Sequence, residues 1–91
     1  MKRKGRKEVE ALKTTLAGAI GERIERLKAS SGITQSTVAR RLGITQPRLS
    51  YLRSGKLDQF SVDYLVQVAV GLGLSVHFRI ARPYRAQPGA K

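Results

Sequence analysis

The stretch between Glu25 and Asp58 contains amide and cationic side chains but no carboxylate. Guanidinium, ammonium and amide groups donate hydrogen bonds to phosphate oxygens and to the edges of DNA bases. Two glutamines, Gln35 and Gln46, each stand at the start of a short segment with a helical apolar pattern. This combination favours an anionic partner. The cations of the stretch are Arg26, Lys28, Arg40, Arg41, Arg48, Arg53 and Lys56.

Residue types suited to catalysis are scarce. The chain has one histidine, His77, on the polar side of an alternating segment, and it has no cysteine. Glu22 and Glu25 alternate with arginines on a helical pattern, which is typical of a solvated charged face. A general acid or base needs desolvated or hydrogen-bonded neighbours. The sequence therefore predicts a binding protein that is not an enzyme and uses no metal and no cofactor.

Length and charge bound the architecture. With 91 residues the chain fits one small domain, and 18 Lys and Arg against 6 Asp and Glu give a net charge of +12. No apolar run approaches the roughly 20 residues that span a bilayer. We expect a disordered basic arm over 1–8, a folded domain over 9–81 and a flexible tail over 82–91. The cations of the arm are Lys2, Arg3, Lys4, Arg6 and Lys7.

Apolar spacing and capping residues predict a mainly α fold. Leu12, Leu16, Ile20, Ile24 and Leu27 mark an amphipathic helix that a left-handed Gly32 would end. Hydroxyl residues that can cap a helix N-terminus precede three later apolar segments. The last of these helices should run from Val62 to Leu72. The expected N-caps are Thr34, Thr45 and Ser61, and the last helix should bury Val62, Leu65, Ala69 and Leu72.

The period of the apolar pattern changes near the C-terminus. Leu74, Val76, Phe78 and Ile80 alternate with polar or small residues, as in a strand with one apolar face. An unpaired strand is unfavourable, and the sequence contains no second strand. We therefore expect this strand to pair with the same strand of a second copy, which makes the protein a homodimer.

The segment from Gln35 to Leu52 has the spacing of a helix-turn-helix. The first helix would be 35–42 and the second 46–54, with Gly43 in a turn position that requires a positive φ. Pro47 falls in the first turn of the second helix, where its missing N–H is harmless. An ordinary helical hairpin used only for packing is the alternative. The acid-free polar residues of the second helix favour DNA binding over that alternative.

The sequence from Thr34 to Lys56 resembles the lambda-repressor/Cro-like, or XRE-type, helix-turn-helix. Residues 14–80 are similar to the branch with HigA-type antitoxins and small phage or bacterial regulators. The resemblance implies a domain of four to five helices with a C-terminal dimerisation strand. It also implies that a homodimer binds double-stranded operator DNA of inverted-repeat sequence, usually as a repressor.

The resemblance also assigns roles to individual residues. The second helix of the motif would enter the major groove, where Gln46 would pair with a base edge, and Gln35 would contact phosphate and brace Gln46. Pro47 departs from the glutamine or serine usual at its position and offers only apolar contact. The implied base-reading residues are Thr45, Gln46, Pro47, Ser50 and Tyr51. The implied backbone contacts are Gln35, Arg48, Arg53, Ser54 and Lys56.

Two alternatives stay open at this point. An antitoxin that neutralises an mRNA-cleaving toxin and represses its own operon would share the fold and length, although a +12 chain would repel the basic toxins of this kind. A nucleoid-like or RNA-binding protein would act mainly through the arm and tail. In each case we expect a cytoplasmic, nucleoid-associated location in a prokaryotic cell, with a phage gene as a possible source.

Overall fold

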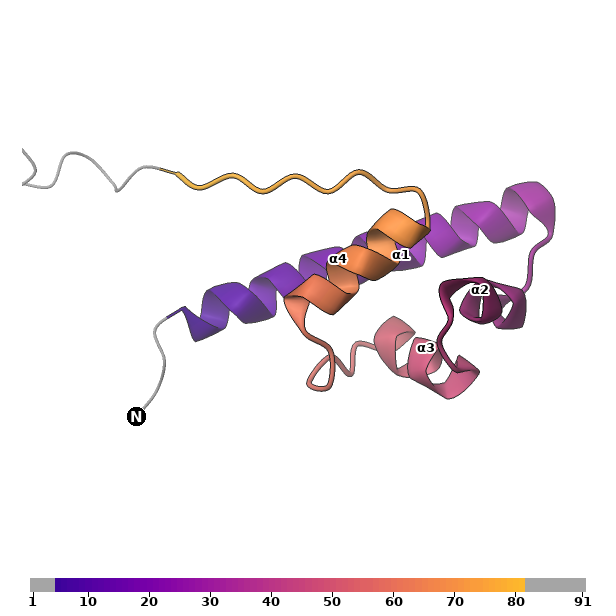
Figure 1. Ribbon diagram of the computed structural model, residues 1–91, viewed down its shortest axis with the longest axis horizontal. Coiled ribbons are helices and arrows are strands. Elements are labelled where there is room, and N and C mark those ends of the chain that lie inside the picture. The colour runs from indigo at the N-terminus through magenta and orange to yellow at the C-terminus, as the bar shows by residue number, and fades with distance from the viewer. Residues whose placement is uncertain (1–4, 82–91) are drawn as a thin grey trace, which may run out of the picture.

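The computed structural model describes residues 5–81, and these form four helices (Figure 1). The long helix α1 (Arg6–Ser31) lies beside α4 (Val62–Gly71), while the short α2 (Gln35–Leu42) and α3 (Gln46–Arg53) lie together on one side of this pair. Within residues 5–81, no helix combines the length and the hydropathy that crossing a bilayer would require.

The predicted helix boundaries are confirmed by their caps. Thr34, Thr45 and Ser61 each accept a hydrogen bond from the backbone N–H three residues later. Such a cap stabilises a helix by about 1 kcal/mol. Gly32 and Gly43 end α1 and α2 in the left-handed conformation, at φ 72° and 74°. These local signals fix where the two helices of the motif begin and turn.

The core joins all four helices. Ile20 and Ile24 of α1 are fully buried, and so are Leu49 of α3 and Leu65 of α4. Ala39 of α2 is 2% exposed, and its small side chain fits the close crossing of α2 and α3. The orientation of α3 is therefore set by packing against the whole domain. The buried apolar residues are Leu16, Ile20, Ile24, Val38, Ala39, Leu49, Leu52, Phe60, Leu65, Val68, Ala69 and Leu72.

The structure corrects the predicted start of the domain. Residues 6–8, which were assigned to the arm, form the first turn of α1, and the Val9 N–H donates to the Gly5 carbonyl. Composition alone favoured disorder, but arginine, lysine and glutamate are good helix formers and this turn continues a long helix. Leu12 belongs to the apolar pattern of this helix but is exposed, because the burial of α1 begins at Leu16. The last helix ends at Gly71, and Val62 is only half-buried.

The segment after α4 is extended, but it has no partner strand among residues 5–81. Leu74 and Val76 pack partly against the core, whereas Phe78 is 58% and Ile80 is 94% exposed. In Figure 1 this segment runs back from the end of α4, away from α2 and α3. Burial alternates only over Leu74–His77, and the strand and its pairing across a dimer remain predictions.

Candidate nucleic-acid interface

The surface of α3 carries the residues that the sequence assigned to base reading. Leu49 and Leu52 point into the core, and the helical period then leaves the other side of α3 in solvent. No acidic residue lies in the first turn of this helix. The exposed residues of this surface, called the reading face below, are Thr45, Gln46, Pro47, Ser50 and Tyr51.

The N-terminus of α3 is built rigidly. The Thr45 hydroxyl accepts a hydrogen bond from the Arg48 N–H at 3.2 Å, and Pro47 sits in the first turn as predicted. Proline fixes its own φ, so this turn loses little entropy when a ligand binds. The Gln46 side chain therefore projects from a preorganised helix start.

Arg48 does not lie free on the surface of α3. Its guanidinium carbon stands 4.6 Å from the ring centre of Phe60 and 5.0 Å from that of Tyr64. The two rings stack on each other with their centres 5.7 Å apart. A guanidinium over aromatic faces gains cation–π attraction while its edge N–H groups stay available to an acceptor. The predicted backbone contact by Arg48 would thus come from an immobilised side chain.

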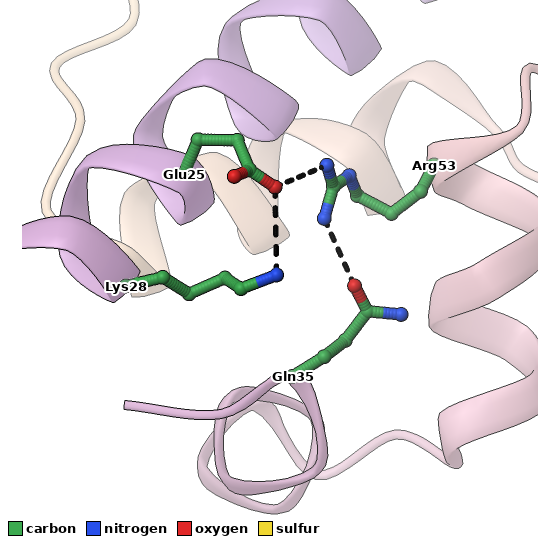
Figure 2. Close-up of polar contacts among 4 residues, drawn as sticks. All are labelled: Glu25, Lys28, Gln35 and Arg53. Atoms are coloured by element: carbon green, nitrogen blue, oxygen red, sulfur yellow. Dashed lines mark hydrogen bonds and ion pairs between the residues drawn. The ribbon is translucent and has the colours of Figure 1, made fainter. Parts of the chain in front are cut away.

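Arg53 connects three helices (Figure 2). Its Nη1 donates to Gln35 Oε1 at 2.9 Å, and its Nη2 donates to Glu25 Oε2 at 2.8 Å. Lys28 Nζ lies 3.6 Å from the same Glu25 oxygen. We call this set of four side chains the Arg53 cluster. Gln35 is thus bonded to Arg53, and within residues 5–81 it forms no hydrogen bond to Gln46, so the bracing that the resemblance implied stays a prediction.

The charge of Glu25 is stabilised by its neighbours. The hydrogen bond from Arg53, together with the charge of Lys28, lowers the pKa of the Glu25 carboxyl. Because the folded-state pKa lies below the unfolded one, the contribution to stability is complete above the unfolded pKa. It is lost as the pH falls through the folded value. The tie between α1 and α3 is therefore sensitive to acid.

We expect the Glu25→Gln variant to have a lower Tm than the wild type at pH 7. This gap in Tm should narrow as the pH falls below about 4.3. Thermal unfolding at pH 7 and pH 3 measures this gap. Glu22→Gln, which alters an exposed carboxylate of the same helix, is the matched control and should show a smaller gap at pH 7. A Glu25→Gln gap of equal size at both pH values would refute the stabilising role of the ion pair.

The end of α3 presents the remaining predicted backbone contacts. Ser54 and Lys56 are exposed, and the Ser54 hydroxyl donates to the Tyr51 carbonyl at 3.1 Å. Lys56 Nζ lies 5.7 Å from the Tyr51 ring centre. Gly55 makes the turn between Ser54 and Lys56 with φ 85°. A cation and a hydroxyl thus stand beside the reading face.

The basic arm is described only in part. Lys2, Arg3 and Lys4 lie outside the described residues. Arg6 and Lys7 are exposed on the first turn of α1. A contribution of the arm cations to DNA binding is a prediction from their charge.

The sequence analysis did not predict the partners of Arg48 and Arg53. Glu25 was assigned to a solvated face, and the aromatic pair Phe60–Tyr64 was assigned no role beside Arg48. Arg23 was also missed, and its Nε donates to the Leu72 carbonyl at 2.8 Å, which holds the end of α4. These contacts join residues far apart in the chain, so no local pattern could have indicated them.

Comparison with known proteins agrees with this geometry. Residues 3–81 match a family model described as a helix-turn-helix domain. A solved structure, a "Putative XRE Family Transcriptional Regulator", is similar with a TM-score of 0.74 and 34% identity, over 92% of this chain and 90% of that chain. No curated protein matches the sequence. The chain therefore belongs to the XRE-type helix-turn-helix family of DNA-binding transcriptional regulators.

Proposed function

We propose that the protein is a sequence-specific repressor that binds duplex DNA by placing α3 in the major groove. The observation that carries this proposal is the reading face itself. Its side chains are exposed, polar or small, and free of acidic groups, on a helix whose opposite side is anchored by Leu49 and Leu52. The major groove of B-DNA is wide enough to admit such a helix.

The chemistry of the reading face defines what it can recognise. A glutamine amide pairs with adenine through N6 and N7, so Gln46 is the proposed source of base discrimination. Ser50 offers a hydroxyl to several base edges, while Pro47 and the Tyr51 ring offer apolar contact to thymine methyl groups. The combination favours A·T pairs within the half-site.

The contacts that position the protein on the DNA backbone would come from side chains around the reading face. Lys56 and Ser54 lie at the end of α3, and the stacked Arg48 lies beside the start of α4. Phosphate contacts set register and orientation without reading sequence. A chain of net charge +12 also gains non-specific attraction for DNA.

The proposed active species is a homodimer joined through 74–80. Phe78 and Ile80 extend beyond the core of their own protomer, whereas Leu74 and Val76 pack partly on it. Antiparallel pairing with a second copy would satisfy the backbone and cover the exposed apolar side chains. A twofold axis would then present two copies of α3 to successive major grooves, about 34 Å apart, on an inverted repeat.

The proposal is tested by measuring binding to two duplexes over a range of salt concentrations. One duplex is selected by the protein from random DNA, and the other has the same bases in scrambled order. We expect Lys56→Ala to weaken both duplexes alike and to reduce the salt slope by about one per protomer, since one phosphate contact is lost. Gln59→Ala changes a neighbouring exposed residue without altering charge and is the control. A salt slope unchanged by Lys56→Ala would place this lysine away from the phosphates. Equal affinity of the wild type for the selected and the scrambled duplex would contradict sequence-specific recognition.

A further inference from the structure

The Arg53 guanidinium is already engaged by protein acceptors. Glu25 opposes its charge at 2.8 Å and Gln35 accepts from its other terminal nitrogen at 2.9 Å, while the side chain is only 23% exposed. The guanidinium keeps further N–H groups, but the Glu25 carboxylate already opposes its charge, so a phosphate would gain less from Arg53 than from an arginine with no acidic partner. The arrangement is better suited to holding a neighbour than to contacting DNA directly.

The neighbour that Arg53 holds is the amide of Gln35. Because the amide oxygen accepts from Arg53, the NH₂ group is the end that remains to donate, as Figure 2 shows. A free glutamine can present either end, but a phosphate oxygen only accepts hydrogen bonds. Fixing the oxygen on Arg53 therefore selects the amide orientation that suits a phosphate.

We infer that Arg53 is a positioning residue for DNA binding, which Glu25 anchors and which holds the Gln35 amide with its NH₂ group presented to a DNA phosphate. The inference rests on the proposed function and replaces the direct backbone contact expected for Arg53. It joins α1, α2 and α3 in one network, so the phosphate contact of α2 depends on a side chain of the reading helix.

The choice of substitution separates positioning from direct contact. Lysine serves well as a point-charge phosphate ligand, so a direct contact would survive Arg53→Lys. A single ammonium lacks the planar fork that holds Glu25 and Gln35 together, so a positioning role would not survive. Arg53→Met removes the charge and keeps an apolar stem. Lys56→Met is the matched control, because it removes a cation proposed to lie directly on phosphate.

The experiment measures the affinity of the full chain for its selected duplex across salt concentrations, in wild-type and Gln35→Ala backgrounds. Thermal unfolding curves confirm that each variant is folded at the temperature of the binding assay. We expect Arg53→Lys and Arg53→Met to weaken binding by a similar factor, about tenfold, as for the loss of one charged hydrogen bond. We also expect the salt slope of Arg53→Lys to equal that of the wild type. In the Gln35→Ala background both substitutions should have little further effect, since coupled residues are not additive.

Retained affinity in Arg53→Lys, combined with a slope reduced by Arg53→Met as much as by Lys56→Met, would overturn the positioning role. The positioning role would also be overturned if the Arg53 substitutions weakened DNA binding as much in the Gln35→Ala background as in the wild type. Either result leaves the proposed function standing, because the wild-type protein would still bind its duplex specifically. Failure of the wild type to prefer the selected duplex would instead contradict the proposed function, and the inference with it.

Discussion

A Phe78→Asp variant is expected to sediment as a monomer at micromolar concentration, where we expect the wild type to sediment as a dimer. Phe78 is 58% exposed in the single chain, and dimer pairing would bring it into an apolar seam with Val76. A carboxylate in that seam would lose its hydration without gaining a partner. Because a dimer would bind the two half-sites as linked modules, the affinity of the variant for the inverted repeat should fall by a factor of about 10² or more.

Ser75→Asp is the matched control for this substitution. Ser75 is exposed on the opposite side of the extended segment and bonds to His77 at 3.1 Å. The same charge placed there should leave the dimer and its DNA affinity nearly unchanged. A wild-type monomer at micromolar concentration would contradict the proposed assembly. A dimeric Phe78→Asp protein that binds the inverted repeat normally would contradict it equally.

The Gln46→Ala substitution is expected to remove base discrimination without unfolding the domain. Gln46 is exposed at the first position of α3, and a bidentate amide–adenine pair contributes about 1–3 kcal/mol against the wrong base. The affinity for the selected duplex should fall by the corresponding factor, while the affinity for a scrambled duplex and the salt slope stay constant. Fluorescence anisotropy with both duplexes measures the two effects.

Gln67→Ala provides the matched control, since it removes an exposed amide from α4. It should alter neither affinity. If Gln46→Ala weakened both duplexes equally, Gln46 would be a backbone contact, and the reading face would have to be assigned elsewhere on α3.

Local chemistry made most of the fold predictable. The caps Thr34, Thr45 and Ser61 and the left-handed Gly43 each act within a few residues of their own position, so the sequence alone indicates them. Burial of Leu49 and Leu52 follows from the helical period, and exposure of the reading face follows from the same period. The helix boundaries that these residues determine were therefore confirmed, whereas the start of α1 at Arg6 was not predicted.

Predictions that depended on distant partners were less successful. The stretch from Arg26 to Lys56 contains no acid, yet folding brings Glu25 onto Arg53 across 28 positions. Arg48 and Arg53 look equivalent in the sequence, but one stacks on aromatic rings and the other bridges α1 and α2. Local patterns give the direction of a side chain from its helix, whereas its partner depends on how the helices pack.

Selection of bound sequences from random duplex DNA is the most direct test of sequence-specific reading by α3. The full-length wild type should enrich an inverted repeat whose half-sites lie about one helical turn apart, centre to centre. A parallel selection with Gln46→Ala should keep the symmetry and spacing but lose the preference at one position in each half-site. Enrichment of no sequence by the wild type, or identical half-sites from both proteins, would contradict the assignment of α3 as the reading helix.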